Sequence, residues 1–143
     1  MGLADRIKRH EGCRLTPYYD TLGVLSIGYG RNLKFGISQD EADIMFEHDL
    51  QKAAAAAMLI PGYQYCDRVR RGVLCEMVFQ LGLRGVLRFR RMIEAIGNKQ
   101  FVLAAGEMID SRWHRQTPKR VEELAELMAN GEDGEVTQTK GGR

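Results

Sequence analysis

The chain has 143 residues, of which 44% are hydrophobic and 28% charged, and its formal net charge is +2. This length suits one domain with its own core, and the balanced charge argues against wholesale disorder and against a protein that coats a polyanion. No apolar run of about 18 residues exists, so no membrane insertion is expected. The absence of an apolar stretch in the first ten residues argues against a secretory signal, and three cysteines without a C-x-x-C pair fit a reduced cytosolic protein.

The first part of the chain predicts a short helix and a hairpin. Residues 3–11 have helical spacing and are followed by a glycine that suits a helix end. Between 18 and 27, the strand-like runs Y-Y and V-L-S-I flank the turn sequence D-T-L-G, which predicts a β-hairpin. Gly28 and Gly30 on either side of a tyrosine indicate a bulge or a close approach of the backbone.

The rest of the chain predicts helices. Ser38 and Glu41 form a capping box before an alanine-rich helix, and Asp67 is a candidate cap for the next helix, which Gly82 ends. Shorter helices are expected over 85–96, 99–110 and 118–130. Thr117 is the expected N-cap of the last one.

These elements predict an α+β fold that is mostly helical. We expect one domain, 1–130, with a hairpin lobe at about 13–37, a connecting helix at about 39–59 and a helical lobe at 62–130 that includes the helix 3–11. Residues 131–143 contain four glycines and one aliphatic residue, and we expect them to form a flexible tail.

Two carboxylates lie where the chain folds back. Glu11 closes the first predicted helix, and Asp20 opens the hairpin turn. A pair of carboxylates across a gap suits glycoside cleavage, because one gives a proton to the leaving oxygen and the other serves the far face of the sugar. On spacing alone, an exposed structural pair is the commoner explanation.

Three separated blocks add a stronger signal. Residues 11–30 contain E-G-C-R-L, Y-Y-D-T-L-G and S-I-G-Y-G; residues 77–82 read M-V-F-Q-L-G; residues 111–120 contain S-R-W and Q-T-P-K-R. In this order the blocks resemble the phage-type lysozymes (endolysins, glycoside hydrolase family 24). The resemblance implies a lysozyme-like fold that hydrolyses the β-1,4 bond between N-acetylmuramic acid and N-acetylglucosamine of peptidoglycan, without a cofactor or a metal.

The resemblance also implies catalytic roles. Glu11 corresponds to the general acid, and Asp20 to the second carboxylate, which orients the attacking water together with Ser26. An inverting reaction is expected, with the two carboxyl groups about 6.5–9.5 Å apart. Ser26 stands where the family usually has threonine, which is stiffer at χ1, so we expect reduced but retained activity.

Supporting residues follow in the same way. Arg120 falls at the family arginine that pairs with the catalytic glutamate. Arg31 replaces a family histidine, and we expect it to pair with Asp49 on the connecting helix. Three residues are carried over as neighbours of the substrate cleft: Phe79, Gln80 and Trp113. For the tryptophan, packing between helices is favoured over stacking on sugar.

Other readings remain open at this point. Arginines gather at positions 68, 70, 71, 84, 88, 90 and 91. Solvated helix faces with weak attraction to an anionic wall are favoured over a nucleic-acid-binding module, because no aromatic interleaving or recognition motif is present. A lysozyme-fold protein that binds the wall with impaired catalysis is a further alternative, supported by Ser26 and Arg31, and a lytic transglycosylase would not need Asp20.

The resemblance finally implies partners and a location. Peptidoglycan is the expected substrate and a monomer the expected state, with no specific nucleic acid. We expect the protein to stay in the host cytoplasm and to reach the cell wall after a separate holin permeabilises the membrane. The three histidines have no metal-ligand spacing, so no metal site is expected.

Overall fold

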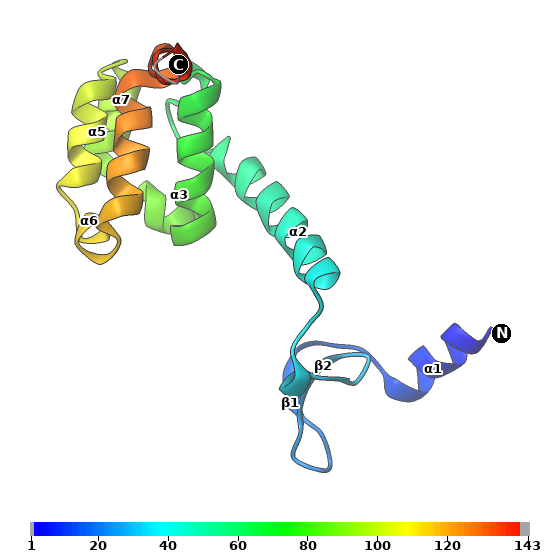
Figure 1. Cartoon of the computed structure of the whole chain (residues 1–143). Coiled ribbons are helices and arrows are strands. Elements are labelled where there is room, and N and C mark those ends of the chain that lie inside the picture. Colours follow the sequence, from blue (N-terminus) through cyan, green and yellow to red (C-terminus); the bar gives the residue numbers. More distant parts are fainter. Residues whose placement is uncertain (1, 141–143) are drawn as a thin grey trace. The chain divides into compact units, whose positions relative to one another are not determined.

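The structure is a computed structural model that describes residues 2–140, with side chains described through Glu132. It is α+β and mostly helical, as predicted (Figure 1). The chain divides into two compact units, Met1–Met45 and Phe46–Arg143, which are described separately below. The predicted inclusion of the helix 3–11 in the helical lobe stays a prediction.

The first unit contains α1 (Leu3–Glu11) and a small antiparallel sheet. Helix α1 ends at Gly12, as predicted, because this glycine adopts φ 69° and its amide donates to the Lys8 carbonyl at 2.9 Å. The hairpin is also confirmed: β1 (Arg14–Tyr19) pairs with β2 (Leu25–Gly28). A two-residue strand, β3 (Arg31–Asn32), pairs with the other edge of β2 and was not predicted.

The capping box forms as predicted. The Glu41 amide donates to the Ser38 hydroxyl at 3.2 Å, and the Ser38 amide donates to Oε1 of Glu41 at 3.1 Å. These reciprocal bonds satisfy two backbone donors at the start of α2 (Gln39–Ala57). A 3₁₀ turn, Leu33–Phe35, separates the sheet from this helix.

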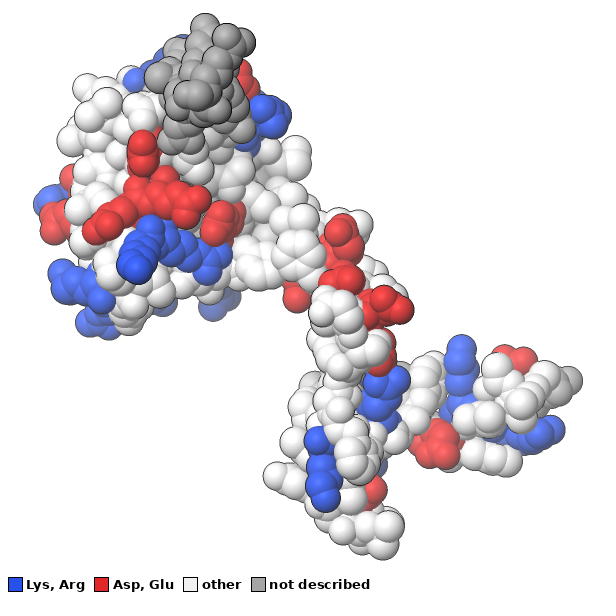
Figure 2. Space-filling view, viewed as in Figure 1, with Lys and Arg blue, Asp and Glu red and all other residues white. Residues whose placement is uncertain are grey.

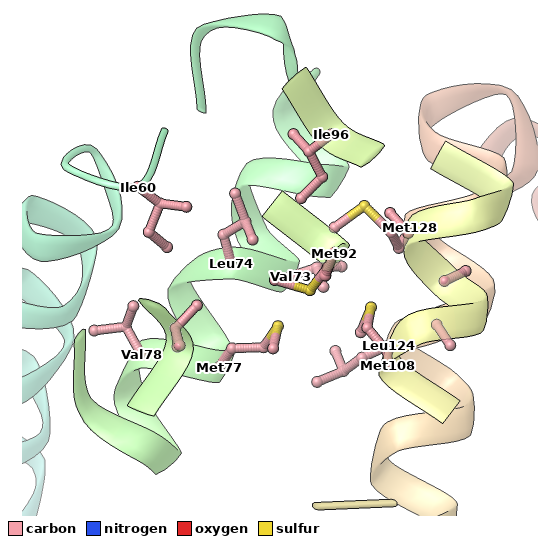
Figure 3. Packing of buried hydrophobic residues seen from close by; sticks show 14 of the residues in the cluster. Ile60, Val73, Leu74, Met77, Val78, Met92, Ile96, Met108, Leu124 and Met128 are labelled. Atoms are coloured by element: carbon pink, nitrogen blue, oxygen red, sulfur yellow. The ribbon is translucent and has the colours of Figure 1, made fainter. Parts of the chain in front are cut away.

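The second unit is helical. After a 3₁₀ turn at Tyr63–Tyr65 its helices are α3 (Arg68–Leu87), α4 (Arg90–Gly97), α5 (Phe101–Ile109), α6 (Arg112–Gln116) and α7 (Pro118–Lys140). Helix α7 packs against α3, α5 and α6 (Figure 1). Four methionines with no solvent exposure lie in the core between these helices, together with aliphatic residues (Figure 3): Met77, Met92, Met108 and Met128. The unbranched thioether side chain fills irregular gaps of this kind.

Several helix boundaries differ from the predictions. Gly82 breaks the helical geometry at φ 74°, as expected, but helical residues resume directly after it and continue to Leu87. The predicted helix 85–96 is therefore two pieces, and α6 was missed because a five-residue helix leaves little periodicity to detect. Thr117 stands at the N-cap position as predicted, because α7 begins at Pro118 and the Val121 amide donates to the Thr117 carbonyl at 3.1 Å. Its hydroxyl, however, donates to the Trp113 carbonyl at 3.3 Å.

Gly131 interrupts α7 with φ 61°, where the glycine stop was expected, and helical residues follow it to Lys140. That 131–143 form a flexible tail stays a prediction, and 141–143 lie outside the described residues.

Arg70 ties the start of α3 to the end of the first segment of α7. Its Nε donates to the Met128 carbonyl at 2.7 Å and its Nη2 to the Ala129 carbonyl at 3.0 Å. Its Nη1 contacts Oδ2 of Asp67 at 2.9 Å, and Oδ1 of the same aspartate caps α3 as predicted. The guanidinium also lies 3.8 Å from the ring centroid of Phe101. One side chain therefore satisfies two main-chain carbonyls that directly precede the interruption at Gly131.

Candidate active site

The first unit holds all three predicted catalytic residues. Asp20 lies at the hairpin turn, where Oδ1 accepts hydrogen bonds from the amides of Leu22 at 2.9 Å and Val24 at 2.8 Å. The Asp20 amide in turn donates to the Val24 carbonyl at 2.9 Å. One carboxylate oxygen thus fixes the turn, while Oδ2 makes no hydrogen bond to the described residues and is left for other partners.

Ser26 lies in β2 opposite Tyr18 and Asn32, in the middle of the sheet. It is 3% exposed and is the buried polar residue of this unit's described part. Its hydroxyl donates to the Val24 carbonyl at 3.2 Å, which directs the proton toward the backbone and leaves the oxygen lone pairs as acceptors.

Glu11 is the last residue of α1, and its carboxylate lies against the turn between β2 and β3. A Cβ built on Gly30 would stand 3.0 Å from Oε2 of Glu11 and 3.7 Å from its Cδ. This contact is a close approach to a glycine backbone, which is one of the two explanations that the G-Y-G sequence suggested.

Arg31 pairs with a residue that the sequence did not identify. Its Nη1 lies 2.6 Å from Oε2 of Glu41, the capping-box residue of α2, and its pairing with Asp49 stays a prediction. Asp49 lies two turns further along α2, in the part assigned to the second unit. Hydrogen bonds from Ser38, and then the Arg31 guanidinium, hold the pKa of Glu41 below its ordinary value.

Arg120 lies in the second unit, at the start of α7. Its Nε donates to Oε1 of Glu76 on α3 at 2.9 Å, and both side chains are partly exposed. A cation in the first turn of a helix is unfavourable by itself, so a specific partner was expected, but the sequence did not identify Glu76. The pairing of Arg120 with Glu11 in the other unit stays a prediction.

Comparison with known proteins decides the family. The sequence profile described as phage lysozyme matches residues 8–128, which is most of the chain and includes the predicted catalytic residues and Arg120. The chain belongs to the phage lysozyme family. It is therefore a glycoside hydrolase that acts on peptidoglycan.

Individual relatives agree with this assignment. A probable T4-type lysozyme 1 of Dictyostelium discoideum is 30% identical over 90% of this chain and 94% of its own length. A probable T4-type lysozyme 2 of the same organism is 28% identical over the same shares. The pre-baseplate central spike protein Gp5 of Enterobacteria phage T4 is 28% identical and matches 92% of this chain but only 28% of its own length.

Two of the expected cleft neighbours of this phage lysozyme contact each other. The Trp113 indole is 4% exposed, its Nε1 donates to Oε1 of Gln80 at 2.9 Å, and its ring meets Phe89 edge-on at 5.9 Å between centroids. The expectation that this tryptophan packs between helices is confirmed. Phe79 is different: it is 41% exposed and lies 5.7 Å from the Phe46 ring centroid, so its role beside substrate stays a prediction.

The arginines of the run differ in exposure and in their contacts. Arg70 is used inside the unit, and Arg71 donates to the Tyr63 carbonyl at 3.4 Å. The exposed members are Arg68, Arg84, Arg88, Arg90 and Arg91. On the face of the second unit that Figure 2 shows, acidic and basic side chains lie in adjoining patches.

No group of three or more potential metal ligands comes together among residues 2–132. Burial raises the pKa of the Cys66 thiol to about 11 and raises that of Cys75, which disfavours the reactive thiolate form. No described helix is both long and apolar enough to cross a membrane.

Proposed function

We propose that this phage lysozyme cleaves the β-1,4 bond between N-acetylmuramic acid and N-acetylglucosamine with inversion at the anomeric carbon. Glu11 protonates the glycosidic oxygen, and Asp20 with Ser26 orients a water on the opposite face of the sugar. The observation that carries this proposal is how the two carboxylates are placed and which of their oxygens are hydrogen-bonded. Asp20 is fixed through one oxygen and keeps the other available, while Glu11 closes a helix next to the glycine turn.

The remaining residues have supporting roles in this proposal. Arg120 supplies positive charge for the glutamate, and its Nε contact with Glu76 leaves both terminal nitrogens for a second carboxylate. Arg31 fixes the strand after the glycine turn to the start of α2 through Glu41. Phe79 and Gln80 border the substrate, and Asp49 lines a pocket together with Phe79.

The biological role that we propose is host lysis. The enzyme is made in the host cytoplasm and degrades the wall after a holin has permeabilised the membrane, and it acts as a monomer. Family membership and the likeness to lysozymes over nearly the whole chain support this role.

The deciding experiment compares the wild-type enzyme with Glu11→Gln on purified peptidoglycan and measures the release of reducing ends. We expect the variant to lose roughly 10²- to 10⁴-fold in rate, since that is the usual contribution of a general acid. Asp5→Asn is the matched control, because it makes the same charge change on the same helix. A near wild-type rate for Glu11→Gln would refute the role of Glu11.

A second variant tests Asp20 without loosening the hairpin. In Asp20→Asn, the amide oxygen can still accept the two hydrogen bonds from Leu22 and Val24, while the negative charge is lost. We expect this variant to keep its fold and to lose rate.

The products of the wild-type enzyme test the type of reaction. ¹H NMR of the first products should show the inverted anomer. Fragments ending in 1,6-anhydro sugar would indicate a transglycosylase instead. Folded wild-type protein without any release would indicate a wall-binding protein with impaired catalysis.

A further inference from the structure

The last turn of α1 and the turn between β2 and β3 meet at two adjacent points. Lys8 places its Nζ 5.5 Å from the ring centroid of Tyr29, and Glu11 places Oε2 where a side chain on Gly30 would begin. Lys8 and Glu11 are three residues apart and share one face of the helix. The same face thus contacts two successive residues of the turn.

Gly30 differs from the neighbouring glycines of the hairpin. Gly23, Gly28 and Gly30 have similar positive φ values of 77°, 66° and 76°. A Cβ on Gly23 or Gly28 would meet no atom within 4 Å, whereas one on Gly30 would stand 3.0 Å from the Glu11 carboxylate. All three positions favour glycine for their backbone conformation, but Gly30 has an additional reason, which is the space that Glu11 occupies.

We propose that Gly30 is a positioning residue for Glu11: the missing side chain lets the carboxylate lie against the backbone of the turn. The inference rests on the proposed role of Glu11 as the general acid. Glu11 is exposed, so its side chain would otherwise sample several rotamers. A methyl group at position 30 displaces the carboxylate by a few tenths of an ångström or more, and proton transfer is sensitive to such shifts.

The experiment compares Gly30→Ala with Gly28→Ala. Both variants place alanine at a positive φ, but only the first adds an atom next to Glu11. With soluble, uncross-linked peptidoglycan as substrate, we expect the kcat of Gly30→Ala to fall about tenfold below that of Gly28→Ala, since misplacement by 1 Å can cost about 10²-fold. KM should be similar in both, because binding of the sugar chain does not depend on the acid. Equal losses of kcat in the two variants would overturn the inference.

A change at position 11 gives a second readout that backbone strain alone would not alter. Glu11→Asp keeps a carboxylic acid but withdraws it from the turn. In that background Gly30→Ala should reduce kcat by a smaller factor than in the wild type, whereas Gly28→Ala should have the same effect in both. The inference fails if the factors for Gly30→Ala are equal in the two backgrounds.

An asparagine pair covers the case in which an alanine variant does not fold, and Glu11→Gln separates this inference from the proposed function. If an alanine variant does not fold, as judged by thermal unfolding, Gly30→Asn and Gly28→Asn replace the pair, because asparagine tolerates the left-handed region and still carries the Cβ. Full activity in Glu11→Gln would overturn both the proposed function and this inference. Loss of activity in Glu11→Gln, with no difference between the two glycine positions, would overturn only the role of Gly30.

Discussion

Each of the two compact units of this lysozyme is stabilised internally by a different kind of interaction. Among residues 2–45, Ser26 alone is buried, and the order comes from local hydrogen bonds at Asp20, at the capping box and at Gly12. The second unit has an apolar core that extends over α3, α4, α5 and α7. The proposed catalytic carboxylates therefore lie in the part specified by local signals, and the larger part is specified by packing. Four predictions test this difference, from the largest expected effect to the smallest.

The first prediction contrasts one leucine from each unit. Leu74 on α3 is fully buried, whereas Leu15 on β1 is 86% exposed. We expect Leu74→Ala to lower the free energy of unfolding by about 2–5 kcal/mol, through lost burial and a cavity. Leu15→Ala should stay within about 0.5 kcal/mol of wild type. Urea unfolding of both variants measures this, and similar losses would show that the two units do not differ in this way.

The second prediction concerns the polar contact that joins α3 and α7. Arg70→Met keeps the aliphatic stem but removes the donors to the Met128 and Ala129 carbonyls. We expect a loss of about 1.5–3 kcal/mol, since hydrogen bonds from a charged group contribute this much. Arg88→Met is the matched control because that side chain is exposed. Equal unfolding midpoints for the two variants would assign Arg70 no stabilising role.

The third prediction tests the local signals of the first unit. Ser38→Ala should cost about 1 kcal/mol, the usual value of a helix N-cap. Thr21→Ala, an exposed change in the hairpin turn, serves as the control and should have a smaller effect. If the two variants have equal free energies of unfolding, the capping box adds little to stability.

The capping box of Ser38 and Glu41 also predicts that the stability of the fold depends on pH. The pKa of Glu41 is lowered in the folded protein. The ionised carboxylate therefore contributes fully to folding stability above its ordinary pKa of 4.5, and this contribution is lost as the pH falls through the lowered value. Glu41→Gln should therefore be less stable than wild type at pH 7, and the difference should shrink on acidification. Thermal unfolding from pH 7 to pH 3 measures it, and a difference that grows toward acid would contradict the sign.

Local elements were largely predictable from the sequence. The stop at Gly12, the hairpin turn, the capping box and the Asp67 cap all depend on contacts between residues two to four positions apart. Such contacts are encoded in a short stretch of sequence and need no knowledge of distant segments. The short elements β3 and α6 were missed because they are too brief to show periodicity.

Long-range partners were less predictable. The sequence indicated that Arg120 in a first helical turn needs a partner, but it did not identify Glu76. Nothing in the sequence pointed to the Met128 and Ala129 carbonyls as partners of Arg70. Arg31 pairs with Glu41, which the sequence did not identify, and its expected pairing with Asp49 stays a prediction. A long, flexible guanidinium can reach several acceptors, and which one lies nearest depends on how segments far apart in the chain pack.

The sequence by itself determined the family, the mostly helical α+β class and the residues proposed for catalysis, because motif blocks and helix signals are local patterns of residue types. Only the tertiary structure decided that Trp113 is buried against Gln80, that Arg70 joins α3 to α7, and that Glu11 lies against Gly30. Each of these contacts joins residues at least 19 positions apart, as Glu11 and Gly30 are. Their geometry follows from how helices and turns pack, which no short stretch of sequence specifies.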